Sequence, residues 1–326
     1  MGFSLKDKWV WDFWFAKDGE DYHLFYLQAD RALEDPELRH WNVSIGHAVS
    51  TDLNDWKVLP DAIAPSPVPE GSQGMIPADS CTTWTGCVIQ HDGTWYMYYT
   101  GSSKAEDGLV QRVCLATSND LMAWEKHPAN PLVELDERWY DGLNLERWHD
   151  ASWRDPWVMK DPASDRYHML VTCRANRGEN DGRGAIGYAQ SKNLIDWEVK
   201  EPFLAPGSYG EMEVPQVEKI GRHYYLFCSV SERFTSKQQR ALLAEEPLNG
   251  VIYYMSENLE GPYKSVGSGY LYADAQFSLY SGKVIQGPDK DWYLMGFLNR
   301  DTKGDFVGGL SEPMRINIAP DGQLTV

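Results

Sequence analysis

Three acidic residues stand in surroundings where a carboxylate is unusual. Asp12 lies in the aromatic run Trp-Val-Trp-Asp-Phe-Trp, Asp155 lies in Trp-Arg-Asp-Pro-Trp, and Glu213 lies in Glu-Met-Glu-Val-Pro. Burying a charge without a partner is costly, so such acids need either a basic partner or a function. Two carboxyl groups across a glycosidic bond, one ionised and one protonated, can hydrolyse it, and a third can stabilise the developing positive charge. The three acids therefore indicate glycoside hydrolysis.

Aromatic residues near these acids would suit a sugar ligand. Five tryptophans are expected near the mouth of the site, namely Trp11, Trp14, Trp84, Trp153 and Trp157. A single tryptophan would mean little, but a group of five favours a carbohydrate cleft.

An internal repeat predicts how these residues are positioned. Five strands that each follow a turn and begin with an aromatic residue start at 22, 95, 167, 224 and 292, which are 73, 72, 57 and 68 residues apart. The turns Asp18-Gly19 and Asp92-Gly93 are strong hairpin signals. A second element, a strand followed by a polar turn and a strand opened by an aromatic residue, comes after each of the first four, at 50–56, 118–124, 191–197 and 256–263.

Units of about four short strands are typical of propeller blades. The repeat is longer than the ~40–50 residues of common propellers, which leaves room for loops. Five units can close a ring without an exposed sheet edge. We therefore predict an all-β fold, a single five-bladed β-propeller over residues 1–326. Because the first strand of each blade lines the channel, we expect Asp12, Asp155 and Glu213 to meet there.

Composition restricts the ligand. The 14 Trp, 18 Tyr and 28 Gly residues suit an all-β protein. The formal net charge of −18, without a basic patch, argues against nucleic acid and anionic membranes and favours a neutral or cationic small molecule.

The cysteines and the N-terminus predict a cytoplasmic location. Five cysteines without a CxxC pair argue against a disulfide framework and a thiolate zinc site. The first residues lack the apolar core of a secretory signal, and no stretch is apolar enough to span a bilayer. The eight histidines have no ligand spacing, and no phosphate loop or dinucleotide fingerprint is present, so we expect neither a metal nor a cofactor.

Taken together, these segments resemble glycoside hydrolase family 32, the invertases and fructanases, and its clan relative family 68, the levansucrases. The segment 45–60 resembles the stretch that closes the first blade in family 32, and Trp-Thr-Gly-Cys at 84–87 is similar to its aromatic-Ser-Gly stretch. Arg-Asp-Pro at 154–156 matches a motif of both families, and Glu-Val-Pro at 213–215 resembles Glu-Cys-Pro. The context of Asp12 is closer to the Trp-Asp-x-Trp of family 68 than to the Asn-Asp-Pro of family 32.

The resemblance implies a role for each acid. Asp12 would be the nucleophile, Glu213 the general acid/base and Asp155 the transition-state stabiliser of a retaining hydrolase. The implied substrate is a β-fructofuranoside such as sucrose, a fructo-oligosaccharide or a difructoside, with fructosyl transfer open to the same residues. The residues expected to bind the sugar are Trp11, Trp14, Gln28, Trp84, Thr85 and Arg154.

The resemblance also bears on the organisation of the chain. Residues 311–324 resemble the stretch where family 32 leaves the propeller, so the β-sandwich that usually follows is not expected. A monomer and a homodimer are both compatible with the sequence.

Several alternatives remain open at this stage. Glu211 is a rival to Glu213 for the acid/base role, because residues two apart share one side of an extended strand. An inverting arabinofuranosidase or xylosidase like family 43 would use a similar trio of acids. A carbohydrate-binding propeller without catalytic activity is a further possible function. The rim loops that would select the substrate lie around 65–77, 136–150, 174–183 and 232–246.

Overall fold

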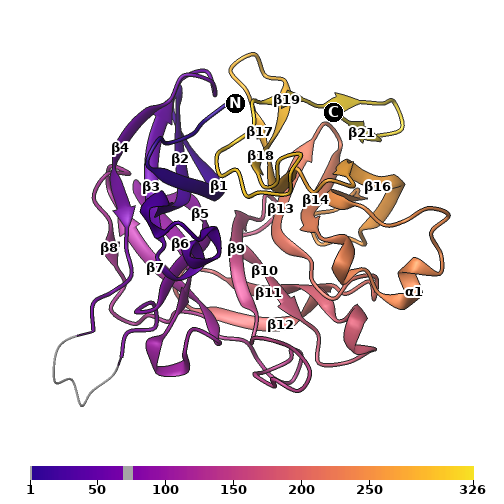
Figure 1. Cartoon of the computed structure of the whole chain (residues 1–326), viewed down its shortest axis with the longest axis horizontal. Coiled ribbons are helices and arrows are strands. Elements are labelled where there is room, and N and C mark those ends of the chain that lie inside the picture. Colours follow the sequence, from indigo (N-terminus) through magenta and orange to yellow (C-terminus); the bar gives the residue numbers. More distant parts are fainter. Residues whose placement is uncertain (1, 69–75) are drawn as a thin grey trace.

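The computed structural model describes residues 2–68 and 76–326, and its strands form five antiparallel sheets around a central axis (Figure 1). The prediction of a five-bladed β-propeller is confirmed. Residues 69–75, within the rim loop at 65–77, lie outside the described residues.

The strands follow one another from the innermost to the outermost in the first four blades. The first two blades contain β1 (Lys8–Asp18), β2 (Asp21–Asp30), β3 (Ser44–Ser50) and β4 (Lys57–Ile63), then β5 (Thr82–His91), β6 (Thr94–Ser102), β7 (Gln111–Ser118) and β8 (Glu125–Lys126). The third and fourth contain β9 (Trp153–Lys160), β10 (Tyr167–Arg174), β11 (Gly184–Ser191) and β12 (Trp197–Leu204), then β13 (Glu213–Ile220), β14 (His223–Val230), β15 (Asn249–Ser256) and β16 (Lys264–Asp274). The fifth contains β17 (Leu279–Gln286), β18 (Trp292–Leu298) and β19 (Met314–Arg315), and a hairpin of β20 (Asn317–Ile318) and β21 (Leu324–Thr325) follows.

Helical segments among the described residues are short and lie in the loops. They are α1 (Lys237–Arg240) and the 3-10 turns Arg31–Leu33, Pro36–Trp41, Lys104–Glu106, Asn180–Gly182 and Glu232–Phe234.

The fifth blade departs from the expected unit of four strands. Its sheet has three strands, and β19 is only two residues long. Outside β18, Leu310 forms bridges with both Phe297 and Phe3, and its N–H donates to the carbonyl of Phe3 at 2.7 Å. The N-terminal segment therefore completes the last blade, and the ring is closed by residues from both ends of the described chain, which lie at the same edge in Figure 1.

Polar turns repeat between the third and fourth strands of the first three blades. In the third blade, the Ser191 hydroxyl accepts the N–H groups of Asn193 (3.1 Å) and Leu194 (3.0 Å), and the Trp197 indole donates to the carbonyl of Leu194 (3.3 Å). In the first blade, Ser50 accepts the N–H of Leu53 and the Trp56 indole donates to the carbonyl of Leu53. In the second blade, Ser118 accepts the N–H of Asp120 and the Trp124 indole donates to the carbonyl of Leu121. The leucine of each turn is buried at a positive φ of 64–66°, an unfavourable conformation that surrounding contacts must hold.

Replacing Ser191 with Ala tests this turn. The substitution leaves the buried N–H of Leu194 without its acceptor, so we expect the free energy of unfolding to fall by about 1–3 kcal/mol. Denaturant titration of Ser191→Ala measures the change, with Lys192→Ala, at an exposed position of the same turn, as the control. Equal stability of the two variants would show that the hydroxyl does not support the turn.

The innermost strand of every blade carries a β-bulge at an equivalent position. The bulges release Asp12 in β1, Thr85 in β5, Asp155 in β9, Val214 in β13 and Ser281 in β17 from regular pairing with the second strand. Three of these residues, Asp155, Val214 and Ser281, have positive φ angles of 55°, 56° and 51°. Bulges re-aim side chains and are common beside active sites. Five bulges facing one axis therefore provide the framework of a site.

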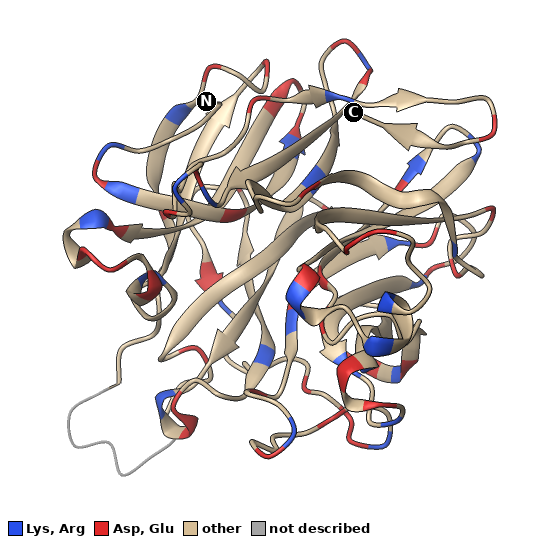
Figure 2. Cartoon of the chain, turned by 45° about the vertical axis from the view of Figure 1, so that its right-hand side comes forward, with Lys and Arg blue, Asp and Glu red and all other residues tan. Residues whose placement is uncertain are grey.

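The charged residues and the thiols are distributed differently over the molecule. In the view of Figure 2, basic residues lie among acidic ones. The five cysteines are free thiols, and all except Cys81 are buried. Within the described ranges, no helix has the length and apolar character needed to cross a membrane.

Candidate active site

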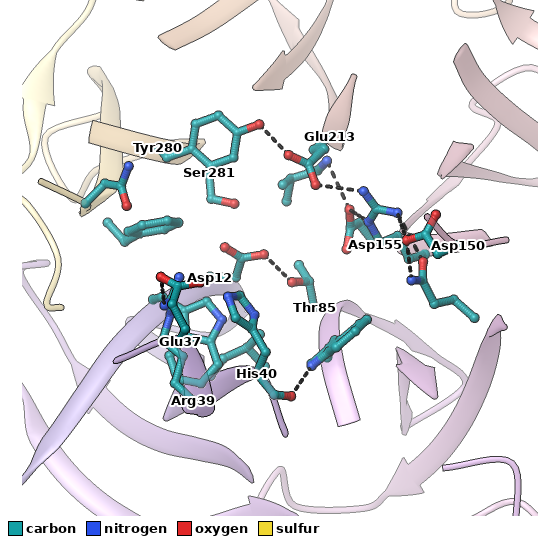
Figure 3. A pocket seen from close by; sticks show the side chains of 18 of the residues that line it. Asp12, Glu37, Arg39, His40, Thr85, Asp150, Asp155, Glu213, Tyr280 and Ser281 are labelled. Atoms are coloured by element: carbon teal, nitrogen blue, oxygen red, sulfur yellow. Dashed lines mark hydrogen bonds and ion pairs between the residues drawn. The ribbon is translucent and has the colours of Figure 1, made fainter. Parts of the chain in front are cut away.

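A cavity of about 680 Å³ opens at the centre of the ring, above the five bulges. Asp12, Asp155 and Glu213 all line it, from β1, β9 and β13, and Figure 3 shows their carboxyl groups facing the same space. The expected convergence of the three acids is therefore observed. Of the residues expected to bind sugar, Trp11, Trp84, Thr85 and Arg154 also line this cavity.

Asp12 is held by its neighbour on the second blade. The Thr85 hydroxyl donates to Oδ2 of Asp12, and Oδ1 makes no hydrogen bond with the described residues. Because both residues occupy bulges on adjacent innermost strands, the backbone fixes the donor and the acceptor alike. One carboxylate oxygen is thus oriented while the other is available to a ligand.

Asp155 is the most enclosed of the three acids. It is 5% exposed, its Oδ2 accepts the Thr172 hydroxyl at 2.7 Å and the Val214 N–H at 3.4 Å, and its own N–H donates to Thr100. Burial raises the pKa of Asp155 to about 6, although the guanidinium of Arg154 acts against this change. The carboxyl group is therefore mostly ionised at pH 7 and becomes protonated as the pH falls through about 6.

Glu213 lies between two donors. Arg154 Nη2 donates to its Oε1 at 2.8 Å, and the Tyr280 hydroxyl donates to its Oε2. Burial, reinforced by the nearby charge of Glu211, raises the pKa of Glu213 to about 7. Because a hydroxyl can also accept, the bond to Tyr280 can persist when Glu213 is protonated. Glu213 can therefore hold or release a proton near neutral pH.

Glu211 has the opposite electrostatic character. Burial alone would raise its pKa, but Arg154 at 3.2 Å and His149 at 3.4 Å overcome this effect and lower it to about 2. A group that stays ionised at neutral pH is a poor proton donor. The lower pKa of Glu211 therefore favours Glu213 as the acid.

One possible ligand atom from each of His149, Asp150 and Glu211 lies within 4.8 Å of the other two, a grouping that could hold a cation. Arg154, however, contacts Asp150 at 3.4 Å and Glu211 at 3.2 Å. The guanidinium is already ion-paired with both carboxylates, so ion pairing accounts for the cluster.

Four residues expected in the site lie elsewhere. Trp14 is 1% exposed and stacks on Phe25, and Gln28 is buried and donates to Ser44 at 3.1 Å. Neither side chain lines the cavity, and the same holds for Trp153, which packs on Tyr140, and for Trp157, which lies against Lys283. For the three tryptophans the physical reason is the bulge, because it turns only one or two residues of each innermost strand toward the axis and leaves the flanking aromatics to pack between strands and blades. Gln28 lies on the second strand β2, where its side chain bonds to Ser44 of β3.

Other lining residues were not anticipated from the sequence. Tyr280 and Ser281 come from β17, and Arg39 and His40 come from the 3-10 turn after β2. The Ser281 hydroxyl is fully buried without a hydrogen-bond partner among the described residues, although Figure 3 shows it directed toward the space between Asp12 and Glu213. Burial and the adjacent Arg39 lower the pKa of His40 to about 3, so its imidazole is neutral at pH 7.

Comparison with known proteins agrees with this architecture. Residues 13–308 match the family described as Glycosyl hydrolases family 32 N-terminal domain, which covers most of the chain. The chain belongs to this family.

Its relatives include hydrolases and transferases. It is 30% identical to a sucrose-6-phosphate hydrolase of Zymomonas mobilis over 195 residues, which are 58% of this chain and 32% of that protein. It is 36% identical to a sucrose:sucrose 1-fructosyltransferase of Festuca arundinacea over 201 residues, 58% of this chain and 26% of the relative. The matched part thus spans about a third or less of these relatives.

Solved structures extend the fold comparison to nearly the whole chain. An inulosucrase from Halalkalicoccus jeotgali bound to kestose superposes with a TM-score of 0.77 at 24% identity, covering 97% of this chain and 86% of that one. Bacillus subtilis levansucrase gives a TM-score of 0.70 at 15% identity, covering 96% and 85%. At these identities the likeness establishes the fold.

Proposed function

We propose that the protein is a retaining glycoside hydrolase that acts on a β-fructofuranoside. The observation that carries the proposal is the pairing, in one cavity, of Asp12 with a carboxyl group, Glu213, whose pKa is raised to about 7. Membership of family 32 and the names of the matched relatives support fructofuranosides as the substrate class.

In the first step, Asp12 attacks the anomeric carbon while the bond to the leaving oxygen breaks. Glu213 donates its proton to that oxygen, which leaves as a hydroxyl, and a fructosyl ester of Asp12 remains. In the second step, Glu213 removes a proton from water, the water oxygen attacks the anomeric carbon, and Asp12 departs as a carboxylate. Two inversions give net retention.

Asp155 assists both steps in this proposal. Its ionised carboxylate accepts hydrogen bonds from sugar hydroxyls and stabilises the positive charge that develops on the sugar ring. Arg154 contacts Glu213 directly and lies 3.6 Å from Asp155, so it orients both groups. A sugar hydroxyl in place of water would give fructosyl transfer, and His149 and Arg233, which line the cavity, are available to contact such an acceptor.

We also infer a cytoplasmic location and a monomeric or homodimeric state. The location rests on the four buried thiols and the partly buried Cys81, all unpaired, which suit a reducing compartment.

Time-resolved NMR tests the proposed function. The purified protein is incubated with sucrose, inulobiose, levanbiose and an arabinofuranoside, and the anomer first released is recorded. Release of β-fructofuranose supports the proposal. Inverted arabinose would assign the protein to the chemistry of family 43, and binding without turnover across the panel would indicate a carbohydrate-binding propeller.

Ser281→Ala tests whether the unpaired hydroxyl binds the sugar. Losing one hydrogen bond to substrate should lower kcat/KM roughly 3- to 10-fold. Stability should not fall, because the substitution removes a buried hydroxyl without a partner. Thr83→Val is the control, since Thr83 has a similarly unpaired buried hydroxyl but does not line the cavity. Equal kcat/KM in wild type and Ser281→Ala would contradict the contact.

A further inference from the structure

A lysine is buried directly beneath the cavity. Lys283 lies in β17, two residues after Ser281, and is 2% exposed. Its Nζ donates to the carbonyl of Val214 at 3.4 Å and lies 5.6 Å from the centre of the Trp157 ring. It does not line the cavity, so it is not placed to touch a substrate.

The residue that Lys283 holds is the strained bulge of the fourth blade. Val214 has a φ of 56°, which is rare for a β-branched residue, and a proline follows it. Its N–H donates to Thr172 at 3.0 Å and to Asp155 at 3.4 Å. The peptide groups on both sides of Val214 are thus fixed. Thr172 and Asp155 of blade three hold the Val214 N–H, and Lys283 holds the Val214 carbonyl. Such strain persists only where surrounding contacts enforce it.

This bulge connects two of the acids in the cavity. Glu213 immediately precedes Val214, so the direction of its side chain depends on the backbone that Lys283 holds. Asp155 accepts the Val214 N–H, so its carboxylate is tied to the same backbone.

Charged and ionisable groups on each of the other four innermost strands act on Lys283 electrostatically. They are Asp12 from β1, Cys87 from β5, Asp155 from β9 and Glu218 from β13. Burial lowers the pKa of Lys283 to about 8, and burial raises that of Glu218 to about 7. Lys283 is therefore mostly a cation at pH 7, although its burial opposes the charge.

We propose that Lys283 is a positioning residue, which holds the strained Val214 bulge so that Glu213 points into the cavity and Asp155 keeps its contact with the same backbone. The inference rests on the proposed function for its kinetic test. Its structural and electrostatic parts can be measured without turnover.

Lys283→Met separates this role from a purely structural one. Methionine has a similar length but neither the charge nor the donor, so we expect kcat to fall about 10- to 100-fold, with a smaller change in KM. Stability should change little, since relief of the buried cation offsets the loss of the hydrogen bond to the Val214 carbonyl. The folded pKa of about 8 lies below the usual 10.5, so the burial penalty applies below pH 8 and disappears as the pH rises further. A variant that fails to fold would overturn the proposal.

The pH profile gives a more specific signature. Lys283 contributes less than Arg154 to lowering the pKa of Asp155, so removing the Lys283 charge should move the acidic limb of kcat/KM to higher pH. The alkaline limb should stay near 7, because the charges acting on Glu213 are those of Glu211, Arg154 and Asp155 rather than of Lys283. Parallel movement of both limbs, or of neither, would contradict the assignment.

Two comparisons complete the experiment. Lys219→Met, at an exposed position of the neighbouring blade, should leave activity and pH profile unchanged. The carboxyl carbon of Asp155, identified in labelled protein by its loss in Asp155→Asn, should titrate near pH 6 in the wild type and higher in Lys283→Met. If the wild type releases no fructose, the proposed function fails, yet this titration still decides the inference, and an unshifted midpoint would overturn it.

Discussion

Asp12→Asn is expected to lower kcat by about 10⁴-fold or more, because an amide cannot form the glycosyl ester through which the reaction is proposed to pass. Asparagine matches aspartate in shape, and its side-chain oxygen can still accept the Thr85 hydroxyl, so the bulge of β1 should be preserved. Fructose release from sucrose by the purified variant measures the loss.

A binding measurement makes the Asp12 test decisive. Calorimetric titration of Asp12→Asn with substrate should show retained binding, since the remaining lining residues are untouched. Asp18→Asn, at the exposed end of the same strand, is the matched control and should behave as wild type. Residual activity of Asp12→Asn within tenfold of wild type would remove Asp12 from the nucleophile position.

The second large effect is expected for Glu213→Gln, which should lose about 10²- to 10⁴-fold in kcat/KM toward sucrose. In the wild type, bond cleavage requires protonated Glu213, so activity should decline as the pH rises through about 7. It should also decline as the pH falls through about 6, where Asp155 becomes protonated. In Glu213→Gln the alkaline limb should disappear, and fructosyl fluoride, whose leaving group needs no proton, should be cleaved with a much smaller loss.

Glu211→Gln distinguishes the two rival acids. Because the charge of Glu211 raises the pKa of Glu213, its removal should move the alkaline limb to lower pH without abolishing it. Complete loss of that limb in Glu211→Gln, with the limb intact in Glu213→Gln, would reverse the assignment.

The sequence predicted the blades well because their signals are local. Asp-Gly turns and Ser-x-Asx-Leu turns need only neighbouring residues, and Asp92 and Gly93 indeed adopt the two positive φ angles of a tight hairpin, 49° and 79°. The short fifth blade was missed because Phe3 and Leu310, which complete it, are brought together only by ring closure.

The site was predicted in part, and the errors at the tryptophans have one origin. Tryptophans near an acid in sequence were expected to share its direction, but the bulges separate Asp12 from Trp14 and Asp155 from Trp157. The rule that found the acids, a position upstream of each aromatic hairpin, also applies to the fifth repeat and would have identified Ser281. Lys283 carried no such signal, because its importance depends on the backbone strain at Val214.

The ring of bulges has a consequence for how such a site can change. The ladder hydrogen bonds that hold each blade lie on either side of the bulge, so the residue at its tip contributes little to pairing. The residues at the five bulges face one point, and each can be substituted without disturbing the sheets that hold them. In the proposed reaction, a substitution at Thr85 or Ser281 should therefore alter which sugar is bound, or whether water or another sugar acts as the acceptor, while the propeller itself stays intact.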